Sequence, residues 1–492
     1  MPVSATGQHI VIVGGGIAGL SAAWRLQNLR DESGVSYRIS LYEADQHVGG
    51  KLRTEHTDGL TIEAGPDSFL SYKPAGIRLA KELGIEDRII GTRDTGGGTF
   101  ILRDGQLEPL PEGITMMVPT KLRPLLRSRL LSTRAKLRMA AEYFVPPRED
   151  DADESIGSFI SRRLGREAFT HMAQPLLSGI FAGDADQLSL ASTFPRLRDI
   201  ERNHGGLVRG MLHQRRTAAK SDAPAAPYPP FVSFADGMGE LADALEERLT
   251  GVDVHAGVAV ENISRDGAGY RLQIRNGEPV SADAVLMATP AYATAGMIDL
   301  MDGQLSALLR RIPYVSSATI ALGYRVEDVA GLQSGRGFVI PHVEDRELTA
   351  VTWVSNKFEG RAPEGMALLR TFVGRAGRED AVNLADDALL ELVQRDLREI
   401  LGITAKPVVS RINRSHRAMP QYVLGHQDRL RQIDSCLVRF PGLEFLGASY
   451  HGVGIPDCID SGDQAARRTH RRLLDALIPQ VSTPASAPIS RG

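Results

Sequence analysis

The chain has 492 residues, 42% of them hydrophobic, and a formal net charge of -3. This length predicts two or three domains with large apolar cores, and the nearly balanced charge argues against a nucleic-acid partner. Cys436 and Cys458 lack CxxC and metal-ligand spacing, so we expect reduced thiols, no metal and a cytoplasmic location. Residues 1–9 lack a signal-peptide pattern, and no apolar stretch is long enough to predict a transmembrane helix.

The first candidate site follows an apolar strand that starts at Ile10. The strand runs into a G-x-G-x-x-G pattern and then into a predicted helix that reaches Leu29. Such glycines permit a tight turn, a close approach of the backbone to a pyrophosphate and close helix–strand packing, and the helix N–H groups would face the anion. The predicted dinucleotide-binding residues are Gly14, Gly15, Gly16, Ile17, Ala18 and Gly19. A glycine-rich turn without a ligand is the alternative.

A second strand, predicted from Tyr37 to Tyr42, ends at Glu43. A carboxylate there can accept hydrogen bonds from both ribose hydroxyls of an adenosine, and its charge would repel a 2′-phosphate. Val48 to Thr54 then supplies two glycines and two cations, Lys51 and Arg53, which could wrap the pyrophosphate from its other side. This favours non-covalent FAD over a nicotinamide cofactor. A surface turn with solvated cations is the alternative.

Further elements in chain order suggest a flavin pocket. The stretch from Glu63 to Phe69 passes from a strand into a Gly-Pro break, whose backbone N–H groups could reach a flavin. A β-hairpin is predicted from Thr99 to Leu110, and alternating strands from Ile312 to Val373 predict a sheet that could roof a pocket. The last helix, expected from Asp460 to Leu477, would direct the positive end of its dipole at the flavin.

The stretch from Pro119 to Phe144 is expected to be helical, amphipathic and basic, with an apolar stripe of leucines at 122, 125, 126 and 130. Such a segment can lie on an anionic membrane surface, which predicts a peripheral, salt-sensitive membrane contact. A solvated helix face of a protein without a membrane contact is the alternative.

Four further motifs resemble those of a known family: Glu63 to Phe69, Gln174 to Asp184, Met419 to Tyr422 and Gly452 to Ile459. With the two nucleotide signatures they resemble the porphyrinogen oxidases of haem biosynthesis, most of all their Gram-positive bacterial branch, within the FAD-dependent amine-oxidase-like superfamily. The likeness spans about residues 10–475. The departures, around Gln214 to Pro230 and in the C-terminal tail, touch no motif.

The resemblance implies an α/β fold with a Rossmann-like FAD-binding domain of p-hydroxybenzoate-hydroxylase type, a sheet-based substrate domain and a helical domain. The implied limits are 1–73, 231–298 and 437–478 for the FAD-binding domain, 74–111 and 299–436 for the substrate domain, and 112–211 for the helical domain. We expect residues 212–230 to be a disordered insertion and residues 479–492 a disordered tail.

Site residues follow from the same resemblance. Besides Gly14 to Gly19, the implied FAD contacts are Glu43, Ala44, Gly50, Lys51, Gly65, Pro66, Asp67, Ser68, Val260, Gly452, Val453, Gly454 and Ile455. The substrate would contact Lys73, Gly179 and Ile180, with Lys73 as a propionate partner; a solvated lysine before a helix is the alternative. No Ser-His-Asp set, carboxylate pair or metal cluster stands out, so the catalytic group stays unknown.

The implied activity is oxidation of coproporphyrinogen III to coproporphyrin III by three two-electron transfers to FAD, with O2 as acceptor and H2O2 as product. The protein would mainly bind, orient and exclude water. Protoporphyrinogen IX is the alternative substrate, and the tetra-acid coproporphyrinogen needs more cations than this di-acid. An amine oxidase, a carotenoid desaturase and a scaffold without chemistry are further alternatives. A downstream haem-pathway enzyme is a possible partner.

Overall fold

The computed structural model describes residues 7–115, 118–119, 122–218, 227–329, 332 and 334–477. The predicted disordered tail and the middle of the predicted insertion lie outside these ranges. Among the described helices, none is long and apolar enough to cross a membrane.

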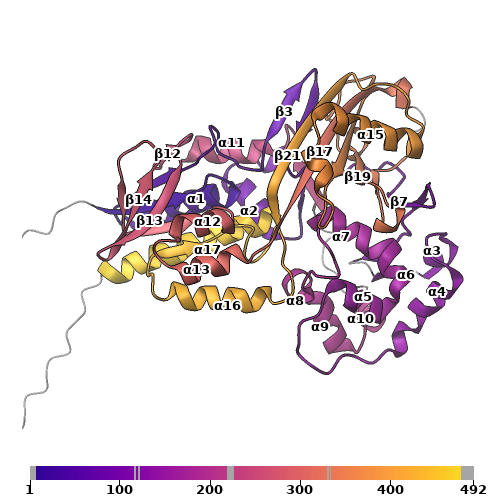
Figure 1. Cartoon of the computed structure of the whole chain (residues 1–492), viewed down its shortest axis with the longest axis horizontal. Coiled ribbons are helices and arrows are strands. Elements are labelled where there is room, and N and C mark those ends of the chain that lie inside the picture. The colour runs from indigo at the N-terminus through magenta and orange to yellow at the C-terminus, as the bar shows by residue number, and fades with distance from the viewer. Residues whose placement is uncertain are drawn as a thin grey trace, which may run out of the picture.

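A parallel sheet lies at the centre of the nucleotide-binding part, and five strands of the described chain form it (Figure 1). The first strand, β1 (Gln8–Val13), is central and pairs with β2 (Tyr37–Tyr42) on one side. Both include the residues that were predicted as strands from the sequence. β1 is almost wholly buried because other elements cover both faces of the sheet, which explains its unbroken apolar run. The other strands of this sheet are β16 (Ala284–Met287), β12 (Asp253–His255) and β22 (Leu443–Phe445).

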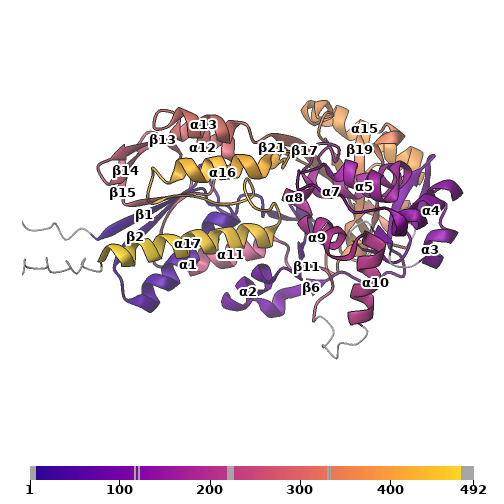
Figure 2. The same ribbon diagram turned by 90° about the horizontal axis from the view of Figure 1, so that it is seen from below.

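Helices cover one face of this sheet. Helices together with a three-stranded sheet of β13 (Val260–Asp266), β14 (Gly269–Ile274) and β15 (Val280–Ala282) cover the other (Figure 2). Ile12 points into a core shared with helices α1 (Ile17–Ser33) and α17 (Ile455–Leu477), whereas Val13 points into the opposite core. The two long helices cross closely, because a Cβ at Gly462 would lie only 2.3 Å from the carbonyl oxygen of Ala18. The opposite core is covered by α12 (Ala291–Ile298), α13 (Gly303–Arg310) and α16 (His426–Leu437).

A second, mixed sheet in the described chain has the strand order β21-β17-β20-β19-β18-β7-β8. One face packs on helix α15 (Asp386–Leu401). Residues of the other face, among them Ala321 and Leu368, pack against Leu60 and Ile62 and so contact the nucleotide-binding part. The strands are β7 (Thr99–Arg103), β8 (Gln106–Pro109), β17 (Tyr314–Arg325), β18 (Gly337–Val339), β19 (Leu348–Trp353), β20 (Met366–Val373) and β21 (Val409–Pro420).

The third part is helical and has its own apolar core. A charged group is buried beside that core: the guanidinium of Arg163 pairs with the carboxylate of Glu142, which also accepts hydrogen bonds from the N–H groups of Leu207 (2.8 Å) and Val208 (3.0 Å). The helices are α3 (Leu122–Arg127), α4 (Thr133–Ala140), η2 (Ala141–Phe144), α5 (Ile156–Leu164), α6 (Arg166–Ala168), η3 (Phe169–Ala173), α7 (Gln174–Phe181), α8 (Leu190–Thr193), α9 (Pro195–His204) and α10 (Leu207–Ala218).

Shorter elements complete these three parts or connect them. The strands are β3 (Thr54–Thr57), β4 (Leu60–Glu63), β5 (Phe69–Leu70), β6 (Ile89–Gly91), β9 (Ile114–Thr115), β10 (Val118–Pro119), β11 (Phe231–Phe234), β13 (Val260–Asp266), β14 (Gly269–Ile274) and β15 (Val280–Ala282). The helical elements are α2 (Pro74–Glu82), η1 (Glu86–Arg88), α11 (Gly239–Arg248), η4 (Val326–Val329), η5 (His342–Glu344), α14 (Val354–Lys357) and η6 (Asp380–Asn383).

The expected single apolar stripe in the basic segment is wrong. The segment is divided into α3, α4 and η2, and α4 starts afresh because the hydroxyl of Ser132 accepts a hydrogen bond from the N–H of Ala135. Leu125 and Leu130 are buried, whereas Leu126 is 64% exposed, so these leucines do not share one face.

Disorder throughout residues 212–230 is also wrong. Helix α10 continues to Ala218, and at the other end the hydroxyl of Tyr228 donates to the carboxylate of Glu86 (2.9 Å). Residues 219–226 lie outside the described ranges.

The core membership of three helices differs from the implied domain limits. Helix α2, inside 74–111, packs in one core with α1 and α17, and α13 and α16, inside 299–436, pack on the nucleotide-binding sheet. The chain passes several times between the two parts, and each apolar helix packs on the nearest uncovered sheet face. The other implied limits and the p-hydroxybenzoate-hydroxylase label stay predictions.

Candidate FAD and substrate site

The turn after β1 has the shape of a phosphate site. A Cβ at Gly19 would lie 1.9 Å from the oxygen of Gly14, so only glycine allows this close packing of helix on turn. A Cβ at Gly16, in contrast, would meet nothing within 4 Å, and no side chain caps the start of α1 at Ile17. The N–H groups at the start of α1 therefore face open space, which suits a pyrophosphate.

Glu43 lies beside this turn at the end of β2. Its carboxylate oxygens accept hydrogen bonds from the N–H groups of Gly15 (2.7 Å) and Asp45 (2.8 Å). These contacts hold the side chain against the glycine turn, and each oxygen keeps a lone pair for a ribose hydroxyl. The backbone carbonyl oxygen of Glu43 accepts a hydrogen bond from the N–H of Val258 (2.8 Å), two residues before Val260. Ala44, which follows Glu43, is exposed. Val260 and Ala44 thus lie near the predicted adenosine end of the cofactor.

The second glycine-containing segment, Val48 to Thr54, packs directly on the Gly14 to Gly19 turn. The N–H of Gly49 donates to the backbone oxygen of Gly15 (2.8 Å). Gly50 has a φ of +59°, and a Cβ at this position would lie 3.0 Å from the Cα of Gly16. Lys51 donates a hydrogen bond to the oxygen of Ala418. Although the Lys51 side chain reaches solvent, desolvation by the surrounding protein lowers its pKa. The structure therefore brings together the two signatures that lie apart in the sequence.

The Gly65 to Ser68 turn is held by the second sheet. Arg370 donates to the oxygen of Gly65, and the ammonium of Lys357 lies 2.8 Å from both carboxylate oxygens of Asp67. A Cβ at Gly65 would lie 1.8 Å from the oxygen of Lys51, so this turn also touches the second signature. Lys357 and Arg370 were not among the predicted site residues, because no local motif marks either of them.

The turn that starts at Gly452 comes directly before α17. This helix begins at Ile455 and not at Asp460 as expected. The N–H of Gly452 donates to the hydroxyl of Tyr422 (2.8 Å), and the N–H of Gly454 donates to Asp457 (3.2 Å). Val453 packs beside the core of the helical part. The Met419 to Tyr422 motif thus has a structural task, because Tyr422 orients the Gly452 turn.

The predicted substrate contacts lie on two different parts. Gly179 and Ile180 are exposed at the C-terminal end of α7, and a Cβ at Gly179 would come 3.9 Å from the side chain of Val339 on β18. An exposed apolar surface between a helix and a sheet suits a flat, apolar ring. Lys73 precedes α2, and its ammonium lies 2.7 Å from both carboxylate oxygens of Asp457. Its role as a propionate partner stays a prediction.

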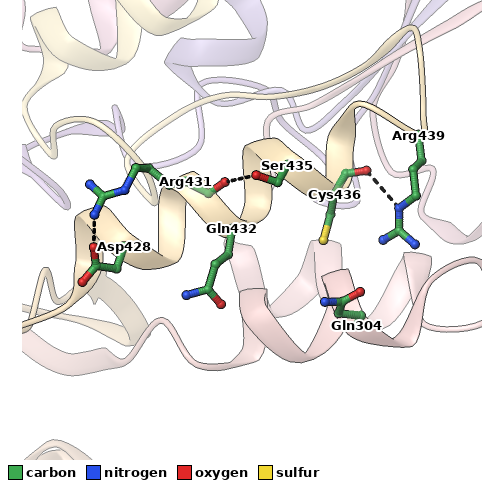
Figure 3. Close-up of a pocket in the computed structure, with 7 residues that line it drawn as sticks. All are labelled: Gln304, Asp428, Arg431, Gln432, Ser435, Cys436 and Arg439. Atoms are coloured by element: carbon green, nitrogen blue, oxygen red, sulfur yellow. Dashed lines mark hydrogen bonds and ion pairs between the residues drawn. The ribbon is translucent and has the colours of Figure 1, made fainter.

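A shallow cavity of about 580 Å³ lies elsewhere, between α13 and α16. Figure 3 shows its lining side chains, several of which are engaged with one another: Arg431 pairs with Asp428, and the hydroxyl of Ser435 donates to the oxygen of Arg431. Since these helices cover the outer side of the nucleotide-binding sheet, the cavity is separate from the residues predicted to bind FAD. Within the described residues, no cluster of His, Cys, Asp or Glu could hold a metal ion.

The comparisons with known proteins agree with this geometry. The family model described as "Flavin containing amine oxidoreductase" matches residues 17–470. The chain is 38% identical over 461 residues to the coproporphyrinogen III oxidase of Bacillus subtilis (strain 168), covering 93% of this chain and 97% of that protein. It is 33% identical over 467 residues to the protein of that name from Staphylococcus aureus (strain NCTC 8325 / PS 47), covering 93% and 98%.

The solved structures point the same way. The crystal structure of a putative protoporphyrinogen oxidase from Exiguobacterium sp. 255-15 superposes with a TM-score of 0.84 at 31% identity, covering 96% of this chain and all of that one. The open glycine turn, the acid that ends β2 and the second glycine signature all fit a flavin dinucleotide. The chain belongs to the flavin-containing amine oxidoreductases, and its cofactor is FAD.

Proposed function

We propose that this protein oxidises coproporphyrinogen III to coproporphyrin III in haem biosynthesis. The observation that carries the proposal is the similarity, over nearly the full length of both chains, to two proteins named coproporphyrinogen III oxidase. The complete nucleotide site supports it, since oxidation of a porphyrinogen requires an electron acceptor next to the ring.

The reaction removes six electrons and six protons from the macrocycle. FAD, held without a covalent bond, supplies a two-electron acceptor that O2 can reoxidise, so three O2 become three H2O2 per porphyrin formed. The chain's own residues bind and orient: Glu43 would hold the ribose, and the turns at Gly65 and Gly452 would fix the ring. The apolar surface at Gly179, Ile180 and Val339 would carry the macrocycle and exclude water.

Two cations are candidates to meet the propionates of the substrate. Lys73 is one, because its partly exposed ammonium shares Asp457 and still has a proton to donate. Arg375 is the other: it follows β20, and the next residue, Ala376, donates its N–H to the oxygen of Ala182 (2.7 Å), close to Ile180. Among the described residues, no ion pair engages the Arg375 guanidinium, whose pKa is lowered by burial and by Arg378.

Protoporphyrinogen IX is the second candidate substrate, favoured by the name of the Exiguobacterium structure. The two substrates differ in charge, with four propionates against two. A site that contains both Lys73 and Arg375 favours the tetra-acid, because each charge-assisted contact adds binding energy that the vinyl groups cannot replace.

A peripheral membrane contact is a further proposal, and it concerns the apex of the helical part. Leu137 is 68% exposed and Phe144 80% exposed, and the cations Arg123, Arg127 and Arg134 are exposed nearby in the chain. Attraction of these cations to anionic lipid would be screened by salt. Vesicle co-sedimentation that persists at high salt would contradict this proposal.

A cytoplasmic location and exchange of product with a downstream haem-pathway enzyme are the remaining parts of the proposed function.

An anaerobic titration tests the proposed function most simply. Purified holoprotein is mixed without O2 with freshly reduced coproporphyrinogen III, and the flavin absorbance is followed. We expect the flavin band to bleach while porphyrin absorbance appears, and to return on admission of air. A flavin that stays oxidised with every porphyrinogen, yet bleaches with an amine, would contradict the proposal.

A further inference from the structure

Three residues of the second sheet and its flanking helix α14 contact the segment from Ala64 to Ser68, which includes the turn that would face the flavin. The hydroxyl of Thr319 on β17 donates to the oxygen of Ala64 (3.4 Å) and Arg370 on β20 donates to that of Gly65. Lys357, the last residue of α14, contacts Asp67 and Ser68: its ammonium lies 2.8 Å from the carboxylate of Asp67 and 3.2 Å from the hydroxyl of Ser68. The turn therefore has a fixed position relative to the sheet.

The groups in this contact are buried and charged. Arg370 is 5% exposed, and the side chains of Lys357 and Asp67 are 16% and 13% exposed. Burial alone would raise the pKa of Asp67, but Lys357 and Arg370 hold it well below its usual range. Asp67 is therefore an anion at neutral pH, balanced by two cations.

The surroundings add a further acid and a further base. The carboxylate of Glu63 accepts hydrogen bonds from the N–H of Met238 (2.7 Å) and the hydroxyl of Thr54 (2.8 Å), and Arg361 donates to the oxygen of Phe234 (2.7 Å). The described cluster thus holds more cations than carboxylates. The Nε of Arg370 has no hydrogen-bond partner and lies at a small cavity that Glu63 and Asp67 also line. Burial lowers the pKa of Arg370, whereas the charges of Asp67 and Glu63 oppose this effect.

We propose that Lys357, Asp67 and Arg370 form a positioning network that tunes the electron affinity of the bound flavin. The proposal rests on the placement of the flavin against the Gly65 to Ser68 turn in the proposed function. Reduction adds negative charge to the ring, and in a site with little water a fixed cation nearby favours the reduced form, whereas a fixed anion disfavours it. Lys357 and Asp67 should therefore act in opposite directions on the flavin potential.

Two single variants test this opposition. Asp67→Asn removes the anion, so we expect the two-electron midpoint potential of the flavin to rise. Lys357→Met removes one of the two cations beside Asp67, so we expect the potential to fall. We expect each change to reach about tenfold in the reduction equilibrium, which is ~30 mV for a two-electron couple. The potential is measured on purified holoprotein against reference dyes, without any porphyrinogen.

Matched variants separate this effect from loosened packing. The double variant Asp67→Asn, Lys357→Met should return towards the wild-type potential, and Lys357→Arg, which keeps the charge, should stay close to it. Arg411→Met breaks an exposed ion pair with Glu55 and should leave the potential unchanged. If Asp67→Asn does not fold, the comparison of Lys357→Met with Lys357→Arg still decides.

Shifts of the same sign in both single variants, or unchanged potentials with full FAD occupancy, would overturn the proposal. The test is independent of the porphyrinogen reaction, because the potential can be measured on a flavoprotein that oxidises another substrate. A purified protein that holds no FAD would instead contradict the proposed function.

Discussion

Lys73 and Asp457 join two segments that lie far apart in the chain: the Lys73 ammonium is 2.7 Å from both carboxylate oxygens of Asp457. Lys73 follows the Gly65 to Ser68 turn, and Asp457 lies in the first turn of α17. The pair therefore links two turns predicted to touch the flavin. A propionate that binds Lys73 must share the ammonium with Asp457.

We predict that Lys73→Ala lowers kcat/KM for coproporphyrinogen III more than for protoporphyrinogen IX. The lost charge-assisted contact is worth roughly 1.5–3 kcal/mol, so the ratio of the two values should fall about tenfold if the tetra-acid makes the contact more often. Asp457→Asn is the control, because it breaks the pair but keeps the Lys73 charge and should preserve the ratio. Equal losses for both substrates would show that Lys73 supports only the fold.

Arg375→Gln should also lower the preference for the tetra-acid, mainly by raising KM, because it removes a guanidinium that forms no ion pair with a carboxylate of the described residues. Arg378 offers a matched control in the same turn, since its guanidinium already pairs with Asp345 and Glu347 (2.7 Å). We expect Arg378→Gln to leave the substrate ratio unchanged. The idea fails if both variants change the ratio alike, as measured by porphyrin fluorescence.

Glu43→Ala should weaken FAD retention about tenfold or more, because it removes the predicted ribose acceptor and leaves the N–H groups of Gly15 and Asp45 without their partner. Flavin content after dialysis and the thermal midpoint measure this. Glu261→Ala, which breaks an exposed pair with Arg275, is the control and should retain FAD. Full flavin occupancy and unchanged thermal stability in Glu43→Ala would show that the carboxylate does not hold the cofactor.

Acid should destabilise the protein partly through His426. Burial lowers its pKa from 6.5 to about 4, and its Nε2 lies 2.9 Å from the oxygen of Tyr450. Between these pH values the unfolded chain binds a proton that the folded chain does not, so stability present above pH 6.5 is lost as the pH falls towards 4. The full window corresponds to about 3 kcal/mol.

The check compares urea unfolding of the wild type with that of His426→Gln at several pH values. The variant should lose less stability between neutral and acid pH, because Gln does not titrate. His416→Gln, at an exposed position, should follow the wild type. Parallel curves for all three proteins would rule out the buried histidine as a source of acid sensitivity.

The parts of the site that a sequence can reveal are those formed within one short stretch. Gly14 to Gly19 and Glu43 could be predicted because one strand–turn–helix unit and the next strand hold them together. Lys357 could not, because its partner Asp67 is 290 residues away and only the second sheet brings them together. The parallel sheet was foreseeable for the same local reason.

Tertiary packing explains the expectations that failed. The predicted leucine stripe of the basic segment did not form, because Ser132 caps the start of a new helix. The spacing of the leucines does not reveal this contact. The expected disorder near Tyr228 reflected composition, whereas its hydroxyl has a partner in Glu86. Helices α13 and α16 belong to the nucleotide-binding part because their apolar side chains share a core with its sheet, whatever their place in the chain.

Oxidation of coproporphyrinogen III can be tested by a direct comparison of the two porphyrinogens. Holoprotein is given freshly prepared coproporphyrinogen III and protoporphyrinogen IX side by side under air, and porphyrin fluorescence gives kcat/KM for each. We predict a kcat/KM for coproporphyrinogen III that is higher by about tenfold or more, since its two additional propionates can meet cations. A clear preference for protoporphyrinogen IX would contradict it.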